Sequence, residues 1–516
     1  MSDLLRQRKE LFVSGHAGSP PFSVLFITVA LLPALILVSS ASAICLSRIF
    51  PRTCGALRSP TLIRAIFECI TFILPLIATL TVAPTISVIT GVCGLCIAAL
   101  SFSLHHTTSA AATNMNTNTA LTSLPPSRLL RGSIAILTAI CILAVDFNTF
   151  PRTSAKTEEF GTSLMDAGVG VVAFAGGLTS RTARRGLSTT PPPARSISAL
   201  LLRITPLILL AVARSVSHAA LHLPLHVSEY GVEWNFFATL AVLAIFDDFF
   251  LNPVMTALPI LQQRGLAGER ARVILITSMA MLMMLMIDFI YLGDSTSLAQ
   301  WLLHGERGPS FFQRNREGFG SLPGFITLHL IGTASGLIGA NESSRIALFC
   351  AMSCAILLSL TGYFWNTKSS LFVNTSSSAA ASAGVTIADG FPISRRLANT
   401  PYIAWTSLIT LASLGLWRLV IRIVIPFAAA TTATTTTMLS QPLFISMIIE
   451  SAGIFPGPIF LFANILTGLA NTSADIIWGG ALDAPPIAAF CICSLQAIAV
   501  SFLAVFLHRT HLLFTS

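Results

Sequence analysis

The sequence predicts an all-α protein, a transmembrane helical bundle that crosses a membrane many times. Of its 516 residues, 54% are hydrophobic and only 10% are charged. The mean hydropathy is +0.79. Many apolar runs extend for about 18 to 25 residues, the length that a helix needs to cross the hydrocarbon core of a bilayer. These observations exclude an ordinary soluble enzyme.

The first predicted span follows a polar N-terminal tail, residues 1–21. The apolar run at 22–44 is too long for a cleaved secretory signal, so we predict that residues 22–516 form a single multispan membrane domain. Apolar runs and loop signals then predict about 13 spans. Their ranges are 22–46, 64–83, 86–104, 129–145, 163–180, 197–216, 235–256, 272–292, 322–339, 346–364, 401–427, 457–476 and 486–507. The segment 443–454 is expected to be a re-entrant or interfacial piece.

Arginine placement predicts the orientation of these spans. If the N-terminus lies outside the cytosol, the loops after spans 1, 3, 5 and 7 are cytosolic, and they are richer in arginine than the opposite loops. We therefore predict a lumenal N-terminus and a cytosolic C-terminus. The segment 146–162 and the glycan sequon at Asn374 are then lumenal.

Charge and cysteine usage do not indicate nucleic acid or metal. The net charge is +9, but the basic residues are spread over short loops, which membrane topology explains. Cys93 and Cys96 have metal-like spacing without a second pair or a polar setting, so no metal site is expected. We expect no resident cofactor.

The most informative segment is 146–166, a charged cluster between two apolar runs. Ionisable groups at a membrane boundary are usually paired, solvated in a cavity, or functional. The cluster holds Asp146, Arg152, Lys156, Glu158, Glu159 and Asp166.

Other polar residues lie within or at the ends of apolar spans. Arg214 either pairs with a carboxylate such as Asp247, Asp248 or Asp288, tying helices together, or binds a phosphate-bearing headgroup. The small residues at 168–170 and 176–177 predict close helix approach.

Two groups of histidines have possible chemical roles. His218, His222 and His226 share one helical face, which permits a metal or acid–base role. His329 is the only histidine deep in a predicted span, and an acyltransferase of the membrane-bound O-acyltransferase type would need such a buried base.

The segment 146–170 carries a specific resemblance. It reads Asp-Phe-x-x-Phe-Pro-Arg-x-x-Ala-Lys-Thr-Glu-x-x-Gly-Thr-Ser-Leu-Met-Asp-x-Gly-Val-Gly. This resembles the signature of the inositol acyltransferases of glycosylphosphatidylinositol (GPI) anchor assembly, an endoplasmic-reticulum family. Other blocks resemble that family in the same order and cover the chain from end to end, at 9–14, 228–237, 315–318, 394–399 and 463–471.

The resemblance implies an enzyme that transfers a fatty acyl group, often palmitoyl, from the co-substrate acyl-CoA to the inositol ring of glucosaminyl-phosphatidylinositol. We expect Asp146 to be the general base and Lys156 its charge partner or the oxyanion stabiliser. We expect several residues of the family-like blocks to bind substrate in one intramembrane cavity. They are Arg152, Asp166, Glu229, Asn235, Glu317, Arg396 and Asn471.

Two rival interpretations remain open. The chain can be a multispan lipid or solute transporter, or a flippase, with the 146–166 cluster as its gate. Alternatively, Asp146 and Lys156 can form a salt bridge that only fixes the loop. Acyl transfer by the purified chain would separate an enzyme from a transporter.

Overall fold

A computed structural model describes most of the chain. The described residues are 18–39, 62–81, 125–185, 197–221, 229–257, 266–292, 296–338, 393–432 and 446–515, with a few isolated positions besides. Within these ranges the regular structure is helical throughout, and the only strand-like pairing is an isolated bridge between Gly18 and Thr162. The predicted all-α class is confirmed.

Eight helices in the described ranges are long and apolar enough to cross a membrane. Each coincides with a predicted span. They are Pro21–Ser39, Leu62–Thr81, Pro126–Ala144, Phe236–Met255, Arg270–Tyr291, Thr400–Ile421, Pro456–Trp478 and Pro486–His511.

The remaining predicted spans have mixed outcomes. Those at 163–180, 197–216 and 322–339 are helices, although they are not among the eight. The spans predicted at 86–104 and 346–364 lie outside the described residues, apart from three isolated positions. The count of about 13 therefore stays a prediction.

The chain divides into two compact units, each built from two separate stretches of sequence. Unit 1 comprises Met1–Pro21 and Lys156–Leu411, and unit 2 comprises Phe22–Ala155 and Ala412–Ser516. The sequence predicted one multispan domain after the N-terminal tail, and that prediction stays open.

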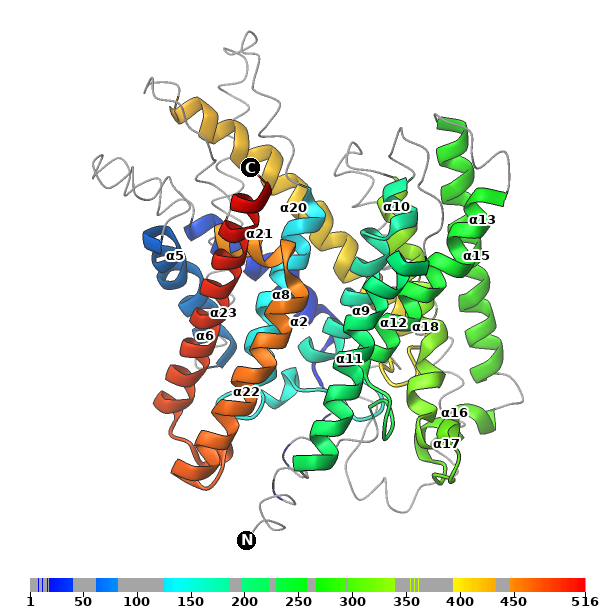
Figure 1. Ribbon diagram of the computed structural model, residues 1–516, viewed down its shortest axis with the longest axis horizontal. Coiled ribbons are helices and arrows are strands. Elements are labelled where there is room, and N and C mark those ends of the chain that lie inside the picture. The colour runs from blue at the N-terminus through cyan, green and yellow to red at the C-terminus, as the bar shows by residue number, and fades with distance from the viewer. Residues whose placement is uncertain are drawn as a thin grey trace. The chain divides into compact units, whose positions relative to one another are not determined.

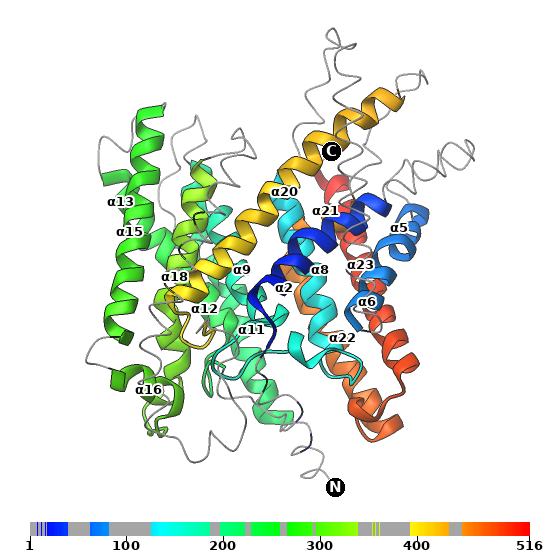
Figure 2. The same ribbon diagram turned by 180° about the vertical axis from the view of Figure 1, so that it is seen from behind.

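Unit 1 is a bundle of long helices, in which α15 and α18 run side by side (Figures 1 and 2). Its elements are α9 (Leu164–Leu178), α10 (Arg181–Arg185), α11 (Ile197–Leu221), α12 (Phe236–Phe246), η5 (Asp247–Leu251), α13 (Asn252–Ala257), α15 (Leu266–Leu292), α16 (Thr296–His304), α17 (Phe311–Arg314), α18 (Arg316–Leu337) and the first part of α20 (Thr400–Thr432).

Glycines allow α9 and α18 to pack backbone against backbone. A Cβ added at Gly177 of α9 would collide with the carbonyl oxygen of His329 on α18, and one added at Gly332 would collide with the carbonyl oxygen of Phe174. The close approach predicted for 176–177 is therefore present at Gly177. Such contact is typical of membrane helices. Lipid gives these helices no hydrophobic reason to associate, so they associate through close packing, which small residues permit.

Unit 2 packs α22 and α23 against α8 (Figure 1). Its elements are α2 (Pro21–Leu25), η1 (Phe26–Leu31), α5 (Leu62–Glu68), η2 (Cys69–Ile73), α6 (Leu74–Thr81), α8 (Pro126–Ala144), η4 (Arg152–Ser154), the rest of α20, α21 (Met447–Ile454), α22 (Pro456–Trp478), η8 (Ala481–Asp483) and α23 (Pro486–Thr515).

The short helix α21 is buried and held by polar contacts at its N-terminus. The carboxylate of Glu68 accepts hydrogen bonds from the backbone N–H groups of Met447 and Ile448, at 2.9 and 3.0 Å. Arg64 donates to the same carboxylate from Nε at 3.0 Å. A carboxylate at a helix N-terminus satisfies exposed N–H groups and the helix dipole. Within the piece expected at 443–454, the described residues Met447–Ile454 form this short helix.

Candidate active site

Asp146 lies just beyond the end of α8, in the turn that leads away from the span. Its carboxylate Oδ2 accepts a hydrogen bond of 2.7 Å from the side-chain amide of Asn471 on α22. The two residues are 325 positions apart in the chain. Unit 2 therefore brings together two of the predicted site residues, and the amide holds the Asp146 carboxylate in place.

Arg152 braces the loop that carries Asp146. Its Nη2 lies 3.0 Å from each of the carbonyl oxygens of Val145, Phe147 and Phe150, and its Nε donates to Phe150 at 3.1 Å. Burial lowers the pKa of Arg152 to about 10, against the opposing charge of Asp146. Because the guanidinium contacts its own loop, these contacts support a bracing role, and substrate binding by Arg152 stays a prediction.

Lys156, in unit 1, forms an ion pair with Glu229. Its Nζ lies 2.7 Å from Glu229 Oε1, with the lysine side chain about a third exposed. Burial would raise the pKa of Glu229, but the charges of Lys156, Arg395 and Arg214 outweigh it and lower the pKa to about 2. Glu229 is therefore ionised at neutral pH, surrounded by more positive than negative charge.

Asp166 is the buried centre of a hydrogen-bond network near the start of α9. Its Oδ2 accepts from the backbone N–H and the hydroxyl of Thr157 and from the hydroxyl of Ser163, at 2.7 to 3.1 Å. Its Oδ1 accepts from Arg395 Nε at 2.9 Å. The carboxylates of Asp166 and Glu229 also raise the pKa of Arg395 against the effect of its burial. Asp166 is occupied by protein contacts, which favours a structural role over direct substrate contact.

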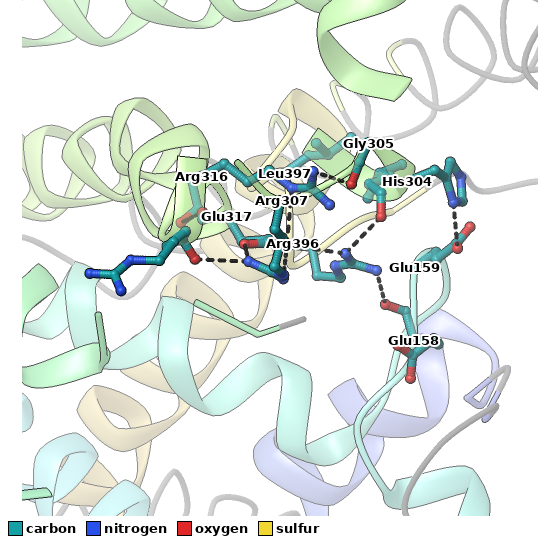
Figure 3. A network of polar contacts seen from close by, with 12 residues as sticks. Glu158, Glu159, His304, Gly305, Arg307, Arg316, Glu317, Arg396 and Leu397 are labelled. Atoms are coloured by element: carbon teal, nitrogen blue, oxygen red, sulfur yellow. Dashed lines mark hydrogen bonds and ion pairs between the residues drawn. The ribbon is translucent and has the colours of Figure 1, made fainter. Parts of the chain in front are cut away.

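Glu317 collects three arginines at the start of α18, and Figure 3 shows the side chains of Arg307 and Arg396 directed toward it. Arg307 holds both carboxylate oxygens, at 2.6 and 3.1 Å. Arg316 lies at 3.3 Å and Arg396 at 3.8 Å from Oε1. Glu317 is almost fully buried, so its charge needs these partners.

Arg396 links this group to the loop that follows Lys156. Its guanidinium donates to the carbonyl oxygens of Leu303 and Glu158, at 3.1 and 3.4 Å. Nearby, His304 Nδ1 lies 3.4 Å from the carboxylate of Glu159 (Figure 3). Burial lowers the pKa of Arg396, with Glu317 acting in the opposite direction.

Asn235 caps a helix. Its Oδ1 accepts from the backbone N–H groups of Phe237 and Ala238, and its Nδ2 donates to the carbonyl of Ala211 at 2.9 Å. These contacts satisfy the first turn of α12. They support a structural role, and substrate contact by Asn235 stays a prediction.

The other polar residues of unit 1 spans have separate environments. Asp248 pairs with Arg203 at 2.7 Å and lies 3.8 Å from Arg181, so it ties helices together. Asp288 accepts from the hydroxyl of Thr400 at 2.6 Å. Arg214 is exposed, and its charge contributes to the lowered pKa of Glu229. Both roles expected for Arg214 stay predictions.

His329 lies next to Asp247 inside unit 1. The two side chains are buried, and Nε2 of His329 is 3.9 Å from Oδ1 of Asp247. The possibility of a buried histidine base therefore stays open. Of the other histidines, the side chain of His218 and the positions 222 and 226 lie outside the described residues, as does Asn374.

Some residues of the site were not assigned from the sequence. Arg395 stands beside Arg396 in a family-like block, yet only the second was expected to bind substrate. Asn315 was also missed, although its Oδ1 accepts from the N–H groups of Glu233 and Trp234, each at 2.8 Å. Gln496, an amide within the last long apolar helix, was the third. Its isolation in an apolar run was the available signal.

Unit 2 offers a held carboxylate, Asp146, and unit 1, taken by itself, offers cations around Glu229 and Glu317. A carboxylate at a span end can accept a proton from a hydroxyl, and cations can bind phosphate or stabilise a developing oxyanion. Among the described residues, no three His, Cys, Asp or Glu side chains gather as metal ligands.

Fold and site together define a multi-pass helical membrane protein with ionisable groups both inside its helices and at their ends. The model of the GWT1 family matches residues 5–507, and the chain belongs to this family. This confirms the resemblance seen in the sequence.

Curated relatives carry the name GPI-anchored wall transfer protein 1. The Aspergillus fumigatus protein is 34% identical over 354 residues, which cover 67% of this chain and 66% of the relative, slightly less than two thirds. The Cryptococcus neoformans var. grubii protein is 30% identical, with 69% and 58% covered. The Yarrowia lipolytica protein is also 30% identical, with 75% and 73% covered.

Proposed function

We propose that the chain is an O-acyltransferase of GPI-anchor biosynthesis. It transfers a fatty acyl group, palmitoyl in our proposal, from acyl-CoA to the inositol ring of glucosaminyl-phosphatidylinositol. It acts as a multi-pass protein of the endoplasmic-reticulum membrane. Membership of the GWT1 family and the names of the curated relatives support this assignment.

The observation that carries the proposal is the Asp146 carboxylate held by Asn471 at 2.7 Å. In the reaction, the carboxylate takes the proton of an inositol hydroxyl while the hydroxyl oxygen attacks the thioester carbon. The carbon–sulfur bond breaks, the ester forms, and the CoA sulfur receives the proton. Lys156 stabilises the negative charge that develops on the carbonyl oxygen.

The positive charge in unit 1 suits the substrates, both of which carry phosphate. Lys156, Arg395 and Arg214 act on a single carboxylate, Glu229. Arg307, Arg316 and Arg396 gather around another, Glu317. Each of these two carboxylates has several cations around it, and arginine is well suited to phosphate recognition.

The test is acyl transfer by the purified chain. Protein in detergent or nanodiscs is given labelled palmitoyl-CoA and synthetic glucosaminyl-phosphatidylinositol. We expect an acylated glycolipid and one free CoA per product. If the protein moves the glycolipid between leaflets of a vesicle but forms no ester, it is the transporter of the rival interpretation and the proposal fails.

A further inference from the structure

Two buried side-chain oxygens in unit 2 have no hydrogen-bond donor. They are Oδ1 of Asn471 on α22 and Oε1 of Gln496 on α23, and neither has a partner among the described residues. The Gln496 side chain belongs to a residue that is only 4% exposed. A buried acceptor without a donor is costly, so such atoms usually meet a ligand or water.

The orientation of both amides is fixed by their other contacts. The Nδ2 group of Asn471 donates to Oδ2 of the Asp146 carboxylate. The Nε2 group of Gln496 faces the carbonyl oxygen of Ala463 at 3.3 Å, and also the hydroxyl oxygen of Thr467 at 3.2 Å. Turning either amide would place oxygen against oxygen. The unpartnered atoms are therefore oxygens.

The Gln496 side chain contacts α22 in the neighbourhood of Asn471. Gln496 contacts Thr467, which stands one helical turn before Asn471. The hydroxyl of Thr467 donates to the carbonyl of Ala463, so it does not serve as a donor for Gln496. Asp146 adds a carboxylate to the same neighbourhood through its bond to Asn471.

The face of α22 that carries Asn471 is polar from Asn464 to Asp475. Asn464, Gly468, Asn471 and Asp475 recur at spacings of three and four residues, which places them on one side of the helix. They are exposed or half-buried. Polar side chains in a membrane helix usually face a cavity or another protein surface.

The neighbouring face of α22 is apolar and exposed. Ile465, Leu469 and Ile476 are 51%, 61% and 80% exposed. This face suits lipid, so a polar stripe lies directly beside an apolar one. A ligand that combines a polar headgroup with acyl chains fits that arrangement.

The chemistry of the acceptors selects the ligand group. Two amide oxygens and the carboxylates of Asp146 and Asp475 repel phosphate and attract hydroxyl or ammonium donors. We propose that Asn471 and Gln496 form an acceptor site for the hydroxyl or ammonium groups of the glycolipid headgroup, with Gln496 a specificity-determining residue. This inference rests on the proposed function, because it names the part of the acceptor substrate that the site reads.

The test compares Gln496→Leu, which removes the acceptor, with wild type. Gln496→Met is a second variant of similar length in case leucine disturbs folding. Ser494→Ala is the control, because its hydroxyl is on the same helix and already bonds the carbonyl of Phe490 at 2.7 Å. The measured quantities are kcat and KM for glucosaminyl-phosphatidylinositol and KM for palmitoyl-CoA.

We expect Gln496→Leu or Gln496→Met to raise KM for the glycolipid about tenfold, the effect of one lost hydrogen bond to a polar or charged group. KM for palmitoyl-CoA and all constants of Ser494→Ala should stay near wild type. A folded Gln496 variant with unchanged KM for the glycolipid overturns the proposal. In that case water, and not the headgroup, donates hydrogen bonds to the two amide oxygens.

A headgroup analogue separates the two donors. If the ammonium group is bound, wild type prefers the free amine over the N-acetylated glycolipid and the Gln496 variants lose that preference. If ring hydroxyls are bound, the Gln496 variants bind the free amine and the N-acetylated glycolipid more weakly by the same factor. Either result supports the site. If wild type shows no acyl transfer, the proposed function fails, and binding of a fluorescent glycolipid to wild type and Gln496→Leu then tests the site independently.

Discussion

At the level of single residues, the charged side chains find partners far away in the sequence. Lys156 pairs with Glu229, 73 positions away, and Asp166 pairs with Arg395, 229 positions away. Each partnership neutralises a charge at the edge of an apolar region, where an isolated ion is costly. The contacts of Glu229 and Arg152 lead to two predictions.

The first prediction concerns Glu229 and pH. Its pKa is lowered from 4.5 to about 2 in the folded protein, so its pair with Lys156 stabilises the fold above the ordinary carboxyl pKa. That contribution is lost as the pH falls toward 2. Glu229→Gln should lower the thermal midpoint at pH 7. The expected loss in the free energy of unfolding is about 1 kcal/mol, because Lys156 is partly exposed and solvent weakens the ion pair.

Melting in detergent at pH 7 and pH 3 checks this. The difference in thermal midpoint between Glu229→Gln and wild type should be smaller at pH 3 than at pH 7. Glu306→Gln, an exposed carboxylate in the same unit, should be neutral at both. A gap between Glu229→Gln and wild type that widens as the pH falls contradicts the assigned pKa.

The second prediction concerns Arg152. Because its guanidinium joins three carbonyls of the Asp146 loop, Arg152→Lys should not restore the brace, since an ammonium group lacks the planar set of donors. Both Arg152→Lys and Arg152→Met should increase protease cleavage near 146–155 and lower kcat. A rise in KM for the glycolipid, with normal kcat and normal resistance to cleavage, would instead support direct substrate contact.

The sequence singled out candidate site residues, whose roles stay predictions, but it did not predict their partners. The charged cluster and the family-like blocks identified Asp146, Lys156 and Asn471. Pairings such as Asp166 with Arg395 require knowledge of how distant segments pack, and no local pattern encodes that. Gln496 stayed unassigned because a single amide in an apolar run gives a weak signal.

At the level of elements, apolar length predicted helices well and their internal irregularities poorly. The helix predicted at 235–256 is present, but it contains the π-helical segment η5, Asp247–Leu251. Such a wide turn is uncommon and is frequently found at functional sites. Hydrophobicity did not predict it: Asp247 and Asp248 begin the segment, but two polar residues within a span do not indicate a wider helical turn.

The third prediction concerns the α9–α18 crossing. Gly177→Ala places a methyl group against the backbone of His329, so it should destabilise the protein by about 1 to 3 kcal/mol, as overpacking usually does. Gly457→Ala is the control, because nothing lies within 4 Å of an added Cβ there. Thermal melting of both variants decides the matter, and equal stability of the two would contradict close packing at Gly177.

At the scale of the whole molecule, apolar length and composition predicted a multi-pass helical protein, and the eight described candidate spans agree. The division into two units was not anticipated, because each unit joins stretches that are distant in the sequence. Apolar runs predict where helices form but not which of them share a core.

The fourth prediction is the orientation in the membrane. The bias of arginine toward the loops after spans 1, 3, 5 and 7 favours a lumenal N-terminus. Residues 365–400 should be protected from protease in sealed microsomes, whereas 181–195 should be cleaved. A glycan at Asn374, removed by Asn374→Gln, would agree. Cleavage of 365–400 from the cytosolic side contradicts the orientation.

The central claim is that Asp146 takes the proton of the inositol hydroxyl. Single-turnover acyl transfer at saturating palmitoyl-CoA and glycolipid tests it most directly, by comparing Asp146→Asn with Asp483→Asn, an exposed carboxylate in the same unit. Asp146→Asn should fold and bind substrate but lose at least about a hundredfold in rate, while Asp483→Asn stays near wild type. A near-normal rate for Asp146→Asn would contradict the account.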